Sequence, residues 1–133
     1  MKGMTPLRAR PATLDDATFL LRLRNDPATV AASMTREVAD VRSHLLWVSS
    51  RITMTRAGVG ALMVVVVDMP GFQVDTYRVG TYRIDPQGVD QEVSLTVKPE
   101  YRGQGYGLQI LALAAAHAVR FGPDSVIARV RRD

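Results

Sequence analysis

Cysteine is absent from the chain, and histidine is scarce, since only His44 and His117 occur. Without cysteine, the chain can form neither a disulfide framework nor a thiolate zinc site. Two histidines are also too few for a histidine-rich metal site. The sequence therefore predicts a protein that holds no bound metal.

Long apolar runs are missing as well. The longest unbroken run, Ala61–Val67, is far shorter than the roughly 20 residues that a membrane-spanning helix needs. The N-terminus has no apolar segment of the kind found in signal peptides. We therefore expect a soluble, cytoplasmic protein with no membrane partner.

The residues that are present are typical of one globular domain. The chain has 133 residues, of which 47% are hydrophobic, and we expect residues 1–133 to form a single domain. The net charge of +4 comes almost entirely from arginine. It fits nucleic acid, a nucleotide-bearing substrate or a phosphorylated cofactor, and a solvated surface would explain it equally well. Nucleic acid is the least favoured partner, because no strand pair carries a mixed aromatic and basic platform.

The first part of the chain predicts a strand and a helix. Residues 7–10 read as a short strand that closes at Pro11. Thr13 and Asp16 form a capping pair for a helix that stops before the sequence Asn-Asp-Pro at residues 25–27.

A second helix is predicted to begin near Glu37. Four apolar residues recur there at spacings of four, three and four and so share one face, namely Val41, Leu45, Val48 and Ile52. We expect that face to be buried and the opposite, polar face to contact water.

The middle of the chain predicts three strands. The run Ala61–Val67 is short and rich in β-branched residues, which is typical of a strand buried on both faces. A turn at residues 70–71, a strand at 77–84, a turn at 85–88 and a strand at 92–97 follow. Two antiparallel hairpins in series result.

The last part predicts a long alanine-rich helix and a final strand. The helix should end at a Gly-Pro stop at residues 122–123, and residues 125–130 should form a strand parallel to its predecessor. The residues that mark this helix are Leu108, Leu111, Ala112, Ala115, Ala118 and Val119. The element order β-α-α-β-β-β-α-β predicts an α+β fold with a mixed, mostly antiparallel sheet flanked by helices.

A glycine-rich loop joins the strand at 93–97 to the alanine-rich helix. Residues 102–107 read Arg-Gly-Gln-Gly-Tyr-Gly. The backbone N–H groups at a helix start have no intrahelical partner and favour an anion, and glycines let phosphate oxygens approach closely. No Gly-Lys-Ser/Thr follows, and the spacing is not GxGxxG, so neither a P-loop nor a dinucleotide fold is indicated. A loop that only makes a tight turn is the alternative.

Residues 97–107 resemble motif A of the GCN5-related N-acetyltransferase (GNAT) superfamily, with a full match at Arg102, Gly105 and Gly107. The resemblance implies that acetyl-CoA is the co-substrate, with its pyrophosphate on the loop amides and its pantetheine arm beside the preceding strand. The cofactor-binding residues that it implies are Leu95, Thr96, Val97, Arg102, Gly103, Gln104, Gly105, Tyr106 and Gly107.

A finer resemblance concerns the acceptor. Residues 23–27, Ser33 and residues 44–47 look like the subgroup that acetylates the 4-amino group of nucleotide-linked sugars. Ribosomal-protein N-terminal acetyltransferases carry similar segments. The implied activity is acetyl transfer to a small-molecule primary amine, with a nucleotide-linked amino sugar ahead of a protein N-terminus or peptide amine.

Two residues are candidates for catalysis, because an amine must lose a proton to attack a thioester. Glu92 resembles the base glutamate of many family members, and a solvated charge at a strand end is the alternative. His44 could accept a proton near neutral pH, although a lone histidine on a helix more often packs or faces solvent.

Two further residues are candidates for acceptor binding. Asn25 ends the first predicted helix, although Asn-Asp-Pro is also a simple helix stop. Trp47 could wall a sugar pocket or pack at the rim of its helix.

The chain departs from the family pattern at its end. The family's last helix and strand pair, with their donor tyrosine, are expected after the final strand, but the sequence stops at Asp133. We therefore expect a C-terminally truncated domain that forms a homodimer through the open edge of residues 125–130, or that is poorly ordered from about Gly122. A non-catalytic CoA-binding module is the third functional hypothesis.

Overall fold

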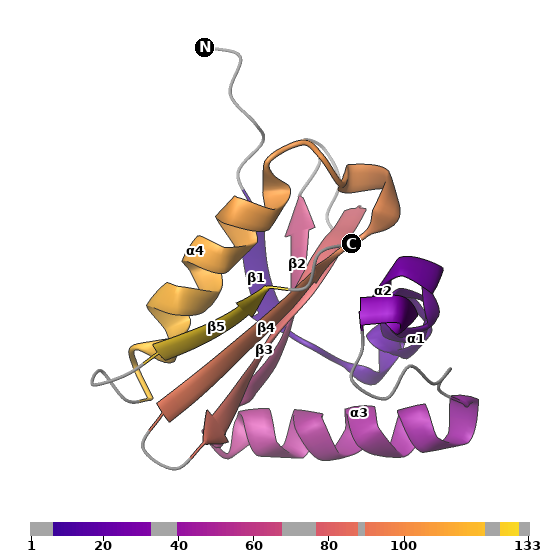
Figure 1. The fold of residues 1–133 in the computed structure, drawn as a ribbon. Helices are drawn as coiled ribbons and strands as arrows, with labels where there is room; N and C mark the ends of the chain where they lie inside the picture. Colours follow the sequence, from indigo (N-terminus) through magenta and orange to yellow (C-terminus); the bar gives the residue numbers. More distant parts are fainter. Residues whose placement is uncertain (1–6, 33–39, 68–76, 88–89, 122–125, 131–133) are drawn as a thin grey trace.

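The computed structural model describes residues 7–32, 40–67, 77–87, 90–121 and 126–130. A five-stranded sheet in the order β1-β2-β3-β4-β5 forms its centre. Helix α4 lies on one face of the sheet, and α1, α2 and α3 lie on the other (Figure 1). The strands are β1 (Leu7–Pro11), β2 (Ala61–Val67), β3 (Tyr77–Gln87), β4 (Asp90–Val97) and β5 (Val126–Val130). The helices are η1 (Leu14–Asp16), α1 (Ala17–Asn25), α2 (Pro27–Ala32), α3 (Val41–Arg56), η2 (Pro99–Tyr101) and α4 (Tyr106–Ala118).

The pairing of the strands confirms the predicted α+β class. β1 to β4 pair antiparallel in sequence order, and β4 and β5 pair in parallel, as the strand–helix–strand connection predicts. The two hairpins in series are therefore confirmed. In the part of the chain that the structure describes, no helix combines the length and apolar character needed to cross a membrane.

Strand β2 is buried along its whole length, as predicted. One set of alternate side chains, including Val65, packs into the core beneath α4, while the other set, including Val64, packs with Leu20 of α1 and Val48 of α3. A strand covered on both faces needs no polar residue, which explains its unbroken apolar run.

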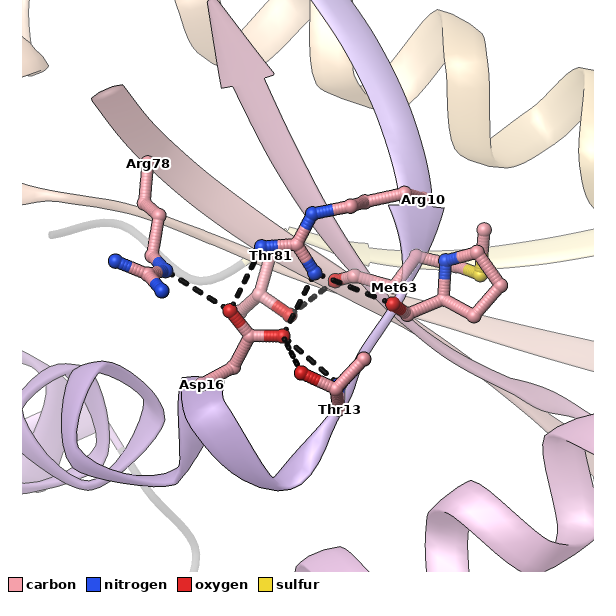
Figure 2. Close-up of polar contacts among 7 residues, drawn as sticks. Arg10, Thr13, Asp16, Met63, Arg78 and Thr81 are labelled. Atoms are coloured by element: carbon pink, nitrogen blue, oxygen red, sulfur yellow. Dashed lines mark hydrogen bonds and ion pairs between the residues drawn. The ribbon is translucent and has the colours of Figure 1, made fainter. Parts of the chain in front are cut away.

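A buried ion cluster fastens the start of α1 to the sheet (Figure 2). Asp16 is 0% exposed. It accepts two hydrogen bonds from the Arg10 guanidinium at 2.7 and 2.8 Å, one from Arg78 Nε at 2.8 Å and one from the Thr13 N–H at 2.8 Å. Burial alone would raise the pKa of this carboxyl, but these hydrogen bonds outweigh burial and lower the pKa to about 2. The predicted capping pair is thus one part of a larger cluster.

The predicted stop at residues 25–27 is correct, but a short helix that was not predicted follows at once. Asp26 accepts a hydrogen bond from the Thr29 N–H at 3.3 Å, and Pro27 is the first residue of α2. Proline suits a first helical position, because its missing N–H would have no partner there. The same three residues therefore end one helix and begin the next.

Helix α3 exists, and the second half of its predicted face is confirmed, since Val48 is 0% exposed and Ile52 packs against the same core cluster, but the first half is wrong. The helix begins at Val41, after Asp40 accepts a hydrogen bond from the Ser43 N–H at 2.9 Å, while Glu37 lies outside the described residues. Val41 and Leu45 are 61% and 42% exposed. The buried residues are His44 and Val48. A count of apolar residues misses this face, because an amphipathic histidine fills one of its positions.

The predicted turn at residues 85–88 begins too early. β3 continues through Gln87, so that Asp85 pairs with Glu92 and Gln87 pairs with Asp90. The last β2 partner lies opposite Ile84, so the end of β3 has a neighbouring strand on one side only. Proline is tolerated in such an edge, which explains how Pro86 fits into a strand. Residues 88–89 and the turn predicted at 70–71 lie outside the described residues.

Helix α4 is confirmed, and its buried face is narrow. Ile110, Ala114 and Ala118 are 0% exposed, whereas Leu108 and Val119 are 76% and 48% exposed. The helix is apolar on most of its surface, so the pattern cannot select the face that meets the sheet. Ala118 is the fully buried residue among the six that mark the helix in the sequence.

Strand β5 pairs with β4 along one side and forms an edge of the described sheet. Residues 122–125 and 131–133 lie outside the described residues, and so does the predicted Gly-Pro stop. The expectations of a truncated domain and of association through this strand stay predictions.

Candidate active site

The loop between β4 and α4 has the backbone geometry of an anion site. Gly103 and Gly105 have φ angles of 74° and 86°, and Gly105 is the N-cap of α4. An added Cβ at either glycine would have no atom within 4 Å. These glycines are therefore required by their left-handed conformation and not by crowding, and the space beside them is open.

The first turn of α4 presents backbone N–H groups to this open space. The amides of a helix start lack intrahelical partners and carry partial positive charge, so the loop can hold a phosphate group. Gln104 Nε2 donates a hydrogen bond to the Glu100 carbonyl oxygen at 3.1 Å and so braces the loop from within. The rings of Tyr101 and Tyr106 meet edge to face at 5.6 Å beside it.

Arg102 connects the loop to the α1–α2 corner. Its Nε donates a hydrogen bond to the Val97 carbonyl oxygen at 3.0 Å, and its Nη1 lies 3.1 Å from Asp26 Oδ2. Its Nη2 lies 3.5 Å from Thr29 Oγ1. Desolvation alone would raise the pKa of Asp26, but hydrogen bonds from Arg102 and Thr29 outweigh it and lower that pKa. The sequence motif singles out Arg102 but gives no sign of its contacts with Asp26 and Thr29, which lie more than seventy positions earlier in the chain.

We expect Arg102→Ala to weaken CoA binding about tenfold and to change pantetheine binding by less than about twofold, because pantetheine lacks the pyrophosphate. Calorimetry with both compounds measures the two affinities. Asp26→Asn is the matched variant, since it removes the carboxylate partner of Arg102 and keeps the arginine charge. It should weaken CoA binding less than Arg102→Ala does. An equal loss of affinity for CoA and for pantetheine in Arg102→Ala would contradict a role of this arginine at the pyrophosphate.

The end of β4 provides a backbone edge beside the loop. The described part of β5 ends opposite Leu95, while on the other side Thr96 and Val97 pair with Thr81 and Gly80 of β3. Leu95 and Val97 belong to the core beneath α4. The structure thus places the predicted pantetheine-binding residues and the loop in one continuous segment.

The face of β3 and β4 opposite α4 carries a polar strip. Tyr82 and Ile84 of β3 and Val93 of β4 belong to the core beneath α4. Because side chains alternate along a strand, the neighbours of these residues point toward the α1–α3 side. The strip consists of Thr81, Arg83 and Asp85 on β3 and of Glu92, Ser94 and Thr96 on β4. Glu92 is half-buried and lies directly across from Asp85. The buried Ser94 Oγ has no hydrogen-bond partner among the described residues.

His44 lies in the packing between α3 and α1. It is 2% exposed, and its Nε2 lies 3.1 Å from the Ala17 carbonyl oxygen. A carbonyl only accepts, so Nε2 carries the proton and donates. Burial lowers the pKa of His44, and the nearby charge of Arg24 lowers it further. The geometry therefore favours a packing role over the predicted proton-accepting role.

Trp47 stands at the centre of an arginine cluster that the sequence did not predict. The guanidinium carbons of Arg24, Arg83 and Arg51 lie 5.3, 5.6 and 5.7 Å from its ring centroid. Asp85 forms ion pairs with both Arg51 and Arg83. These residues come from α1, α3 and β3, and no local pattern in the sequence connects them.

Asn25 is the last residue of α1 and is half-buried beside Asp26. It lies next to the corner that Arg102 contacts. A separate groove of about 460 Å³ lies between α1 and the ends of β3 and β4, and its lining includes Arg22 and Lys98.

A family model described as the acetyltransferase (GNAT) domain matches residues 7–133. The chain therefore belongs to the GNAT family, whose members transfer an acetyl group from acetyl-CoA to an amine. It is an acyl-CoA-dependent N-acetyltransferase. A search of curated proteins finds no match.

Solved structures share this fold at low sequence identity. A ribosomal-protein-alanine N-acetyltransferase from Brucella melitensis is 24% identical, with a TM-score of 0.67 over 91% of this chain and 72% of that chain. Spermidine N-acetyltransferase from Vibrio cholerae, in complex with CoA and spermine, is 14% identical, with a TM-score of 0.67 over 86% and 64%. A phosphinothricin acetyltransferase from Sinorhizobium meliloti, in complex with acetyl-CoA, is 19% identical, with a TM-score of 0.67 over 88% and 61%. The named acceptors differ widely, so the shared fold does not select one.

Proposed function

We propose that the chain acetylates the amino group of a nucleotide-linked amino sugar. The observation that carries the acetyl-CoA part of the proposal is the open loop at Gly103 and Gly105, which joins β4 to the N-terminus of α4, while the acceptor part rests on the sequence resemblance at residues 23–27 and 44–47. Its exposed amides and the adjacent β4 backbone fit the pyrophosphate and the pantetheine arm. Acetyl-CoA, when bound there, supplies the activated acetyl group as a thioester.

The polar strip is the proposed acceptor site. It is continuous with the strand that leads into the loop, so an amine above β4 lies close to the cofactor segment. Glu92 is proposed to accept the proton that the attacking amine must lose. Because His44 donates its N–H to a backbone carbonyl in a buried site, Glu92 is the better candidate.

A protein N-terminus is the second candidate acceptor. The Brucella melitensis structure, whose name gives a ribosomal protein as the substrate, is similar over 91% of this chain. The discriminating experiment measures CoA release with a UDP-linked 4-amino sugar and with a short peptide that has a free N-terminus. Faster turnover of the amino sugar supports the proposal, and faster turnover of the peptide would replace it. Acetyl-CoA binding without transfer to either acceptor would favour the non-catalytic module.

We expect Glu92→Gln to lower turnover mainly at low pH, where the acceptor amine is largely an ammonium ion and needs a base most. CoA affinity should change little. A pH profile of kcat together with CoA titration checks both statements. Normal turnover of the variant at every pH would return Glu92 to the role of a solvated charge.

A further inference from the structure

The arginine cluster around Trp47 carries three positive charges, and among the described residues Asp85 is the carboxylate that forms ion pairs with it. Asp85 is shared between Arg51 and Arg83. Within the described ranges, no carboxylate forms an ion pair with Arg24, and its guanidinium lies over the Trp47 ring. Three guanidinium groups therefore converge on one ring, and in the described part of the chain two of them share the Asp85 carboxylate.

The nearby histidine lies against the same ring. The ring of His44 stacks on Trp47 with a centroid distance of 6.0 Å, and Arg24 contributes to the lowered pKa of His44 after burial. A lowered pKa means that a further positive charge is disfavoured at this position. An anion is the ligand that this environment favours.

The cluster is accessible and adjoins the proposed acceptor site. Arg24 is exposed, Trp47 is half-buried and the Arg83 side chain is 30% exposed. Arg83 pairs across the strands with Ser94, and Asp85 pairs with Glu92. Directly opposite residues in antiparallel strands are about 5 Å apart, so the cluster begins one strand step from the proposed base.

We propose that Arg24 and Arg83 bind the diphosphate of the acceptor against the ring of Trp47. This inference rests on the proposed function and identifies the part of the acceptor that the enzyme recognises. The ion pair with Asp85 holds Arg83 in place before the ligand arrives, which reduces the entropy that binding costs. Arginine provides a planar fork of donors that matches phosphate oxygens. A cationic polyamine would meet like charge here and would bind poorly.

Trp47 makes the test direct, because it is the only tryptophan in the chain. UDP and uridine differ by the diphosphate and can be titrated separately while the fluorescence of Trp47 is recorded. Saturating CoA is present throughout, so that the loop at residues 102–107 is blocked. We expect UDP, but not uridine, to change the fluorescence, with an affinity that falls as salt rises.

Arg24→Gln should weaken UDP binding about tenfold, because one charge-assisted contact is lost. Arg22→Gln is the matched control, since Arg22 is exposed on the same helix and borders the separate groove. It should change the UDP affinity by less than about twofold. Equal binding of UDP and uridine, or the same UDP affinity in wild type and Arg24→Gln, would overturn the inference. A titration with CoA in the absence of UDP tests the cofactor site separately. A failure of the proposed function can therefore be distinguished from a failure of the inference about the diphosphate.

Discussion

Asp16→Asn should destabilise the fold by about 3 kcal/mol or more, because it leaves two arginines facing a partly buried site without their carboxylate. The native carboxyl is 0% exposed and accepts from Arg10, Arg78 and the Thr13 backbone. Removal of one partner of a buried ion pair costs far more than the intact pair contributes. Urea unfolding followed by circular dichroism measures the loss as a lower midpoint at unchanged slope.

The exposed neighbour Asp15 is the matched control for this variant. Asp15→Asn changes the same functional group one residue away, and we expect it to alter the free energy of unfolding by less than about 0.5 kcal/mol. If both variants were equally stable, the cluster in Figure 2 would not be what fastens α1 to the sheet.

The contribution of Asp16 should also depend on pH. Its pKa is lowered from 3.8 to about 2 by folding, so the folded state binds this proton less readily than the unfolded state. The stabilisation is therefore complete above the unfolded pKa and is lost as the pH falls from about 4 toward 2. Urea midpoints of wild type and Asp16→Asn should converge over that range, and a constant difference would contradict the assignment.

Gly105→Glu should reduce acetyl-CoA affinity by more than about 100-fold, because two effects act together. A side chain is strained at a φ of 86°, and the new carboxylate would stand at the helix start where the pyrophosphate is proposed to bind. An added Cβ at this position meets no atom within 4 Å, so the larger residue brings backbone strain but no clash at Cβ. Calorimetry with acetyl-CoA measures the effect directly.

Gly58 offers a control that matches both the strain and the new charge. It has a φ of 77° and no atom within 4 Å of an added Cβ, and it lies between α3 and β2, away from the loop. Gly58→Glu should therefore leave acetyl-CoA affinity unchanged within about twofold. Unchanged affinity in Gly105→Glu, or an equal loss in both variants, would argue against the loop as the pyrophosphate site.

The sequence predicts most of the elements, because the patterns that define them are local. The apolar run of β2 and the glycine loop before α4 each require one conformation, and both appear where expected. The exposed sides of α3 and α4 were harder to predict. A buried histidine takes an apolar position on α3, and α4 is apolar on most sides, so neither face follows from periodicity alone.

The site was predictable along one segment and not across the fold. Residues 95–107 are continuous, so their joint role could be proposed from the motif. The contacts of Arg102 with Asp26, and those of Trp47 with Arg24 and Arg83, join elements that only the folded sheet brings together. No periodicity or spacing in one sequence contains that information.

The central claim is that acetyl-CoA binds on the amides between β4 and α4, and amide chemical shifts test it most directly. Glycine amides resonate in a distinct region of a nitrogen–proton correlation spectrum, so Gly103, Gly105 and Gly107 can be followed during a titration with acetyl-CoA. We expect the largest shifts at these three glycines and along Leu95 to Val97, with Gly58 and Gly60 unchanged. Saturable binding that leaves the three loop glycines unshifted would contradict the claim.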